Sequence, residues 1–115
     1  MGVVVQAVDA KMDRLLGADN MVLFSKTYCT YSDDLKMVLE STGFLDYTVV
    51  ELDVIDDGIA LQECLARRSG VATVPQLFKG SRFLGTSDTF TSLPTTEAKT
   101  SLLIELTADV RASST

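Results

Sequence analysis

Histidine and tryptophan are absent from the 115 residues of this chain, and cysteine and proline occur only twice each. Without histidine there is no Ser–His or Cys–His dyad, no zinc site with a histidine ligand and no histidine acid–base catalyst. Hydrolysis by a histidine-activated nucleophile is therefore excluded. A reactive cysteine in this chain must be activated by a helix terminus or by lysine, which suits thiol exchange.

Positive charge and long apolar runs are also scarce. Lysine and arginine number 10 against 16 acidic residues, a net charge of −6 that argues against nucleic acid as a partner. No apolar run approaches the roughly 18 residues of a membrane-spanning helix, so we expect no membrane partner. The first residues lack the basic region and cleavage site of a secretory signal, and two cysteines indicate reduced thiols. We therefore expect a cytoplasmic protein.

The apolar pattern predicts a single domain over residues 1–115, in which helices and strands alternate. The expected helices cover 3–16, 31–42, 59–70 and 87–110, the last one broken at Pro94. The expected strands cover 21–25 and 47–54, followed by a hairpin with strands at 75–78 and 82–84 around Gly80. This order predicts an α/β fold with a small mixed sheet covered by helices on both faces.

Cys29 stands where the expected strand 21–25 leads into the next helix. The unpaired N–H groups and the macrodipole of a helix N-terminus favour the thiolate, which is the form that attacks disulfides. Three residues on, where a CxxC oxidoreductase has its second cysteine, the chain has Ser32. Unless it is an inert buried thiol, Cys29 therefore acts without a neighbouring resolving thiol.

Cys64 lies on the apolar side of its expected helix, and we interpret it as core packing rather than a second redox thiol.

Three short segments, taken together, resemble the glutaredoxins. They are Lys26-Thr-Tyr-Cys29-Thr-Tyr-Ser32, Thr73-Val-Pro75 and Gly85-Thr-Ser-Asp88, and the resemblance extends from about Val4 to Val110. It implies a thioredoxin fold with a four-stranded mixed sheet. It also implies an enzyme that uses glutathione as co-substrate to reduce mixed disulfides. The partners would then be glutathione and glutathionylated proteins or small disulfides.

The resemblance also implies a role for each matching residue. Cys29 would be the catalytic nucleophile, and Ser32 would support its thiolate with a hydrogen bond. Val74, followed by a cis peptide bond to Pro75, would pair through its backbone with the cysteinyl part of glutathione. The residues that would bind glutathione are Lys26, Tyr31, Gln62, Thr73, Val74, Pro75, Ser87 and Asp88.

The chemistry of glutathione agrees with these assignments, because the tripeptide is extended and carries a carboxylate at each end. Lys26 and Gln62 would hold the glycine carboxylate. Ser87 and Asp88 would begin a helix whose N–H groups receive the γ-glutamyl carboxylate, while the Asp88 side chain meets the neighbouring ammonium. Tyr31 would flank the bound tripeptide.

Several of these residues also have plain structural interpretations. Taken alone, Lys26 is a solvated lysine, Gln62 has no assigned role, Pro75 is a strand-edge proline and Asp88 is a helix cap. The chain also departs from the usual family pattern at Thr86, where a second glycine is common.

Two other functions stay open beside a monomeric reductase. One is a homodimeric carrier, in which two Cys29 thiolates and two glutathiones hold a [2Fe–2S] cluster; otherwise we expect no metal. In the family's main cluster-carrying class, Gly-Phe follows the cysteine, whereas here Thr30-Tyr31 resembles the reductase class. The other is a thioredoxin-fold binding module that has lost catalysis.

Overall fold

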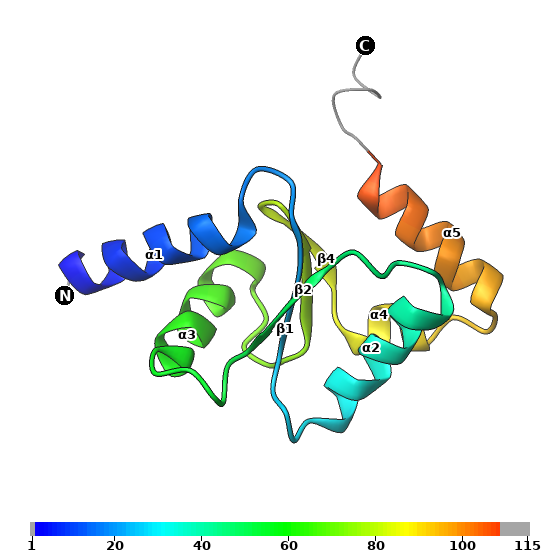
Figure 1. Ribbon diagram of the computed structural model, residues 1–115, viewed down its shortest axis with the longest axis horizontal. Helices are drawn as coiled ribbons and strands as arrows, with labels where there is room; N and C mark the ends of the chain where they lie inside the picture. Colours follow the sequence, from blue (N-terminus) through cyan, green and yellow to red (C-terminus); the bar gives the residue numbers. More distant parts are fainter. Residues whose placement is uncertain (1, 109–115) are drawn as a thin grey trace, which may run out of the picture.

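The computed structural model of the protein describes residues 2–108, so the predicted end of the last helix, up to Val110, lies outside the described residues. In chain order the elements are α1 (Gly2–Leu16), β1 (Met21–Ser25), α2 (Thr30–Ser41), β2 (Thr48–Glu51), α3 (Gly58–Ser69), β3 (Gln76–Lys79), β4 (Arg82–Gly85), α4 (Ser87–Thr91) and α5 (Thr96–Thr107) (Figure 1). None of the described helices is long and apolar enough to cross a membrane.

The four strands form one mixed sheet, as predicted, and their order across the sheet is β2-β1-β3-β4. β1 and β2 run parallel, with Phe24 opposite Val50, because the chain crosses over through α2 between them. β3 runs antiparallel to β1, and the β3–β4 hairpin completes the sheet. This topology places the carboxyl end of β1, and with it Cys29, beside the segment that leads into β3.

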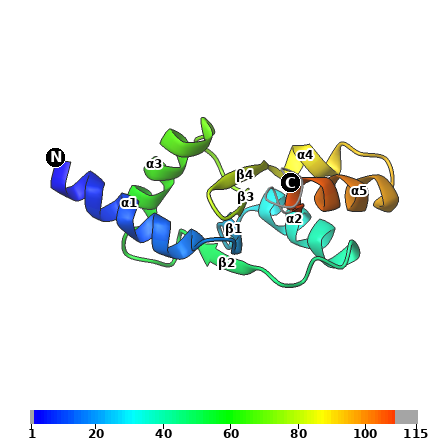
Figure 2. The ribbon, with the colours of Figure 1, turned by 90° about the horizontal axis from the view of Figure 1, so that it is seen from above.

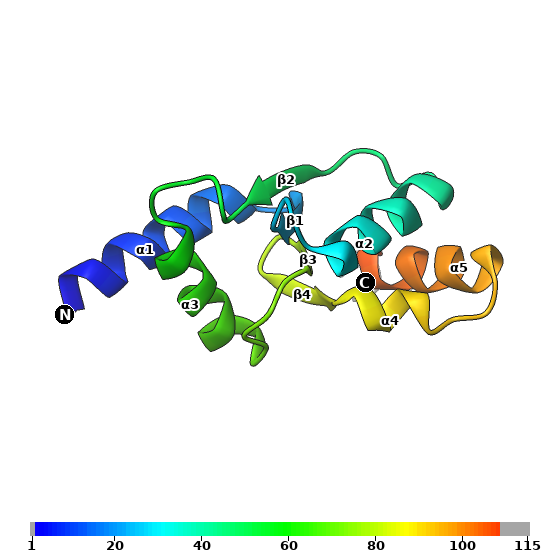
Figure 3. The ribbon, with the colours of Figure 1, turned by 90° about the horizontal axis from the view of Figure 1, so that it is seen from below.

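Helices cover both faces of the sheet, so the molecule has two apolar cores. α1 and α3 lie on one side, and α2, α4 and α5 lie on the other (Figures 2 and 3). Strand alternation divides β1 between them: Val22 and Phe24 belong to the α1–α3 core, and Leu23 belongs to the other core. This division explains why all three side chains are fully buried.

Two predicted elements differ in extent from the observed ones. The strand predicted over 47–54 ends at Glu51, because the N–H of Val54 turns back to donate to the Glu51 carbonyl at 3.3 Å. The predicted helix over 87–110 is two helices, and the break falls at Pro94 as expected. Just after this proline, the Thr95 hydroxyl caps α5 by accepting from the N–H of Ala98 at 3.1 Å.

Polar contacts join α1 to α3. The buried Cys64 thiol donates to the Asp9 carboxylate at 3.0 Å, and Arg67 lies 3.5 Å from the same oxygen. Lys11 forms an ion pair with Asp57 at 2.6 Å. The Cys64 hydrogen bond, together with the charge of Arg67, lowers the pKa of Asp9, and the hydrogen bond from Lys11 lowers the pKa of Asp57.

Stability should therefore fall in acid. A carboxylate whose pKa is lowered in the folded state contributes stability above its ordinary pKa, and that stability is lost as the pH falls through the folded value. We expect the urea midpoint to drop as the pH is lowered from about 5 to below about 4. The urea midpoint of Asp9→Asn should drop less over this pH range than that of the wild type. Asp46→Asn removes an exposed carboxylate instead, and its urea midpoint should drop as much as that of the wild type. Equal losses in wild type and Asp9→Asn would contradict this assignment.

Candidate active site

Cys29 caps the N-terminus of α2 with an extended backbone, as its place in the sequence predicts. Its N–H donates to the Lys26 carbonyl at 3.1 Å, which closes the turn after β1. Its carbonyl accepts from the N–H of Asp33 at 3.2 Å, the first hydrogen bond of α2. The thiol is only half-buried and lies at the helix N-terminus, so it is accessible to a disulfide substrate.

The segment before β3 lies against Cys29. The sulfur is 4.0 Å from the carbonyl oxygen of Val74, and the peptide bond between Val74 and Pro75 is cis, as predicted. A disulfide formed at Cys29 would therefore lie beside the backbone of Val74. Thr73, on the exposed side of the same segment, completes the predicted Thr-Val-Pro group.

A buried glutamine holds this segment in place. Gln76 is completely inaccessible to solvent, and its Nε2 donates to the carbonyls of Val71 at 2.6 Å and Thr73 at 2.9 Å. The sequence interpretation did not single out Gln76. A glutamine within an apolar strand could have indicated this role, because a buried amide must find hydrogen-bond partners.

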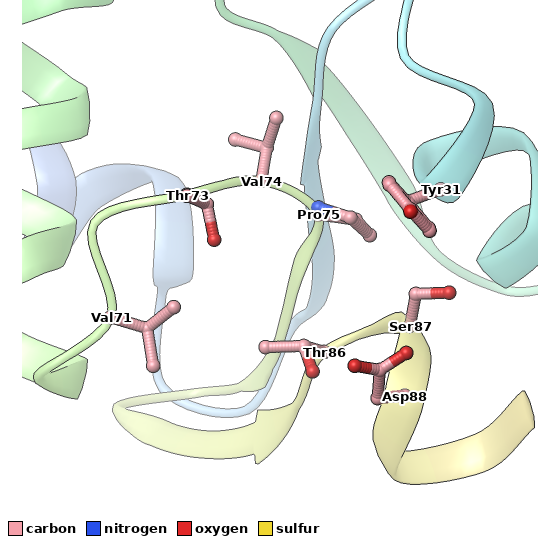
Figure 4. Close-up of a pocket in the computed structure, with 8 residues that line it drawn as sticks. All are labelled: Tyr31, Val71, Thr73, Val74, Pro75, Thr86, Ser87 and Asp88. Atoms are coloured by element: carbon pink, nitrogen blue, oxygen red, sulfur yellow. The ribbon is translucent and has the colours of Figure 1, made fainter. Parts of the chain in front are cut away.

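A cavity of about 530 Å³ opens next to this segment. Its lining residues are Tyr31, Val71, Thr73, Val74, Pro75, Thr86, Ser87 and Asp88 (Figure 4). The structure thus brings together six of the predicted glutathione-binding residues from three separate parts of the chain. In Figure 4, Ser87 lies between Tyr31 and Asp88 at the start of α4. Thr86, where the family pattern has a second glycine, also lines the cavity.

The two remaining predicted residues line a second cavity. Lys26 and Gln62 meet in a space of about 330 Å³, together with Tyr28 and Asp53. Within the described residues, no carboxylate forms an ion pair with the Lys26 ammonium. The Gln62 amide donates to the Ala72 carbonyl at 2.9 Å, so its nitrogen already has a backbone partner.

Ser32 contacts the backbone of the turn that carries Cys29, and its support of the Cys29 thiolate stays a prediction. Its side chain is fully buried, and its hydroxyl oxygen accepts a hydrogen bond of 3.5 Å from the N–H of Lys26. No hydrogen bond joins Ser32 to Cys29 in the part of the chain that the structure describes. The serine therefore fastens the turn that carries the cysteine rather than contacting the sulfur.

Cys64 lies away from this site and packs in the α1–α3 core, as predicted. Burial and the hydrogen bond to Asp9 raise the pKa of the Cys64 thiol. A buried thiol with a raised pKa is a poor nucleophile. Cys29 is therefore the one accessible thiol among the described residues.

A carboxylate outside the predicted set also contacts the site. Asp53 accepts hydrogen bonds from both the N–H and the hydroxyl of Thr27, and these bonds lower the pKa of Asp53. No local pattern predicts this contact, because Thr27 and Asp53 lie 26 positions apart. They meet only because β1 and β2 pair in parallel and end side by side.

Comparison with known proteins agrees with this geometry. The family described as Glutaredoxin matches residues 21–84, which include Cys29 and the Thr-Val-Pro segment. A glutaredoxin from Ricinus communis is 40% identical over 82 residues, which cover 71% of this chain and 79% of that protein. The chain belongs to the glutaredoxin family. It is thus a thiol oxidoreductase in the general sense that the family implies.

Solved glutaredoxins share the fold. The crystal structure of a buckwheat glutaredoxin–glutathione complex aligns with a TM-score of 0.76 at 30% identity, covering 92% of this chain and 96% of that one. The holo form of glutaredoxin C1 from Populus tremula x tremuloides aligns with a TM-score of 0.74 at 37% identity, covering 88% and 95%. The four-stranded mixed sheet with its flanking helices is therefore the thioredoxin fold expected from the sequence.

Proposed function

We propose that this protein reduces glutathione mixed disulfides by a monothiol mechanism through Cys29. The observation that carries the proposal is a single accessible thiol at the N-terminus of α2, with a cavity beside it lined by the predicted glutathione residues. The residue in the position of a second active-site thiol is Ser32, and the only other cysteine is buried in the core. The chain thus offers one thiol for exchange.

Bound glutathione would extend over both cavities. Its γ-glutamyl end would lie in the larger cavity, with its carboxylate at the first N–H groups of α4 and its ammonium at Asp88. Its cysteinyl part would pair with the backbone of Val74, next to the Cys29 sulfur. Its glycine carboxylate would meet the ammonium of Lys26 in the smaller cavity. The buckwheat complex with glutathione supports this choice of ligand, since that protein shares the fold.

The proposed reaction is two thiol–disulfide exchanges. The Cys29 thiolate attacks the glutathionyl sulfur of the mixed disulfide, a Cys29–glutathione disulfide forms, and the substrate leaves as a thiolate that takes up a proton. The thiolate of a second glutathione then attacks the glutathionyl sulfur on Cys29. This step releases oxidised glutathione and restores the Cys29 thiolate. One free glutathione is oxidised for each mixed disulfide reduced, because the other half of the oxidised glutathione comes from the mixed disulfide itself, and one chain suffices for every step.

The alternative function is a homodimeric carrier of a [2Fe–2S] cluster. Cysteine thiolates are the usual ligands of such clusters. Within the described residues, no three His, Cys, Asp or Glu side chains gather in a group suited to a metal ion. One chain therefore contributes only Cys29, and the cluster would need a second copy and two glutathiones as further ligands. The reductase requires no such assembly, and we favour it for that reason.

Initial-rate kinetics test the proposed function. Glutathione is varied at several fixed concentrations of a glutathionylated peptide, and oxidised glutathione is followed. Because the enzyme alternates between free and glutathionylated Cys29, we expect the parallel double-reciprocal lines of a ping-pong mechanism. Intersecting lines would contradict the covalent intermediate. Absence of turnover would contradict the reductase, and anaerobic reconstitution with iron, sulfide and glutathione would then test the carrier.

A further inference from the structure

The turn that carries the active-site cysteine is held by a carboxylate from the next strand. Residues Lys26 to Cys29 form this turn, which the bond from the Cys29 N–H to the Lys26 carbonyl closes. At its second position, the N–H of Thr27 donates to Asp53 Oδ1 at 3.0 Å, and the Thr27 hydroxyl donates to Asp53 Oδ2. Both oxygens of one carboxylate therefore bind the same turn residue.

Asp53 is well anchored for this purpose. The N–H of Leu52 donates to the Ser25 carbonyl at 2.8 Å, so pairing between the two parallel strands continues to the residue before Asp53. Leu52 is buried in the α1–α3 core, which fixes the backbone on that side. The turn itself has little such support, since Thr27 is exposed and the Tyr28 side chain is 73% exposed. The carboxylate thus supplies contacts that packing does not.

We propose that Asp53 is a positioning residue for the Cys29 reaction and that it acts through Thr27. The turn begins with Lys26, which would bind the glycine carboxylate, and ends with Cys29, which would attack the disulfide. Fixing Thr27 fixes the spacing between the binding cation and the reacting sulfur, and small errors in such spacing lower rates strongly. Lys26 and Asp53 also line the same cavity, so the carboxylate lies near the binding cation as well as the turn. This inference rests on the proposed reductase function.

A set of substitutions at the two residues tests the inference. Asp53→Ala removes the carboxylate, Thr27→Val removes the hydroxyl donor, and Thr27→Ser keeps that donor. Asp46→Asn, an exposed acid before the other end of β2, is the matched control. Reduction of a glutathionylated peptide gives kcat and KM, reaction with iodoacetamide gives the rate of Cys29 alkylation, and circular dichroism establishes that each variant is folded at the assay temperature.

We expect Asp53→Ala and Thr27→Val each to lower kcat/KM by about tenfold while the variants remain folded. Thr27→Ser should stay within about twofold of the wild type, because its hydroxyl can still donate. The double variant Thr27→Val/Asp53→Ala should be no slower than the slower single variant, because Asp53→Ala already removes both hydrogen bonds to Thr27. A contact that only stabilised the fold would leave kcat/KM unchanged in variants that are folded at the assay temperature.

Three outcomes would overturn the inference: an unchanged kcat/KM in Asp53→Ala, a Thr27→Ser variant as slow as Thr27→Val, or single effects that multiply in the double variant. Alkylation needs no glutathione, so it separates this inference from the proposed function. If the wild type fails to reduce the peptide, the proposed function fails. The same turn also holds Cys29 at the N-terminus of α2. A severalfold slower alkylation in both Asp53→Ala and Thr27→Val would therefore still support the positioning role, and an unchanged alkylation rate would reject it.

Discussion

Replacing Cys29 with serine should lower the glutathione-dependent reduction of a glutathionylated peptide at least about 10³-fold, to the uncatalysed rate. The reason is chemical, because a serine hydroxyl does not ionise near neutral pH and cannot form the mixed disulfide with glutathione. No other thiol can substitute: Ser32 stands at the second position, and Cys64 has no solvent-exposed surface. The rate at which purified protein forms oxidised glutathione from a glutathionylated peptide measures this loss directly.

The matched control is Cys64→Ser. It should retain the wild-type turnover to within about twofold at a temperature where it is folded, because Cys64 only packs and donates to Asp9. Cys29→Ser itself should unfold at the wild-type urea midpoint. Among the described residues, the half-buried sulfur has one polar contact, a long one of 4.0 Å to the Val74 carbonyl. If Cys29→Ser kept substantial turnover, or if only Cys64→Ser lost turnover, the reacting thiol would be Cys64 and the account would be wrong.

Replacing Gly58 with alanine should lower the free energy of unfolding by about 3 kcal/mol or more. Gly58 is buried at the start of α3, and a Cβ there would overlap the backbone carbonyl of Leu52. A backbone carbonyl cannot move aside as a flexible side chain does. Relief of the overlap must therefore displace α3 or the segment after β2, and both are packed into the α1–α3 core. Urea unfolding followed by circular dichroism measures the loss.

Gly43→Ala provides the comparison for this variant. Gly43 has a φ of 83°, and no atom lies within 4 Å of where its Cβ would be placed. Its substitution therefore costs only the strain of a left-handed backbone, about 1–2 kcal/mol. If Gly58→Ala were no more destabilising than Gly43→Ala, α3 could not lie as close to the Leu52 backbone as the structure places it. Because Asp53 follows Leu52, Gly58→Ala should also reduce activity even where it stays folded.

The fold could be predicted from the sequence because local patterns determine most of it. The apolar strand before Cys29, the helical spacing of Leu35, Val38 and Leu39, and the hairpin around Gly80 each identify an element without knowledge of its partners. Their alternating order then allows few topologies. The ends of elements were less predictable: the β-branched residues continue past Glu51, but a turn stops the strand there.

The candidate site could be predicted only as far as its motifs extend. Tyr31, Pro75 and Asp88 belong to recognisable segments, and the structure brings them to one cavity. Contacts that hold those segments in place were missed, because each depends on which strand lies beside which. Gln76 fastens the loop before β3, and Asp53 fastens the turn before Cys29, yet neither lies in the motif that it supports.

Ser32 shows a related difficulty. Its position in the sequence suggested a hydrogen bond to the sulfur three residues earlier. In the folded chain the first turn of α2 directs the hydroxyl toward the backbone N–H of Lys26 instead. A short polar side chain at a helix N-terminus often finds a backbone partner of this kind, and the choice depends on the exact path of the preceding turn.

The most direct test of the central claim, that Cys29 alone carries the reaction, is mass spectrometry of the enzyme after its first reaction with a mixed disulfide. The protein is mixed with excess glutathionylated peptide in the absence of free glutathione, quenched with acid, and digested. Our account predicts one glutathione per chain, bound at Cys29, which disappears when glutathione is added before the quench. Glutathione on Cys64, a disulfide between Cys29 and Cys64, or an unmodified Cys29 would contradict it.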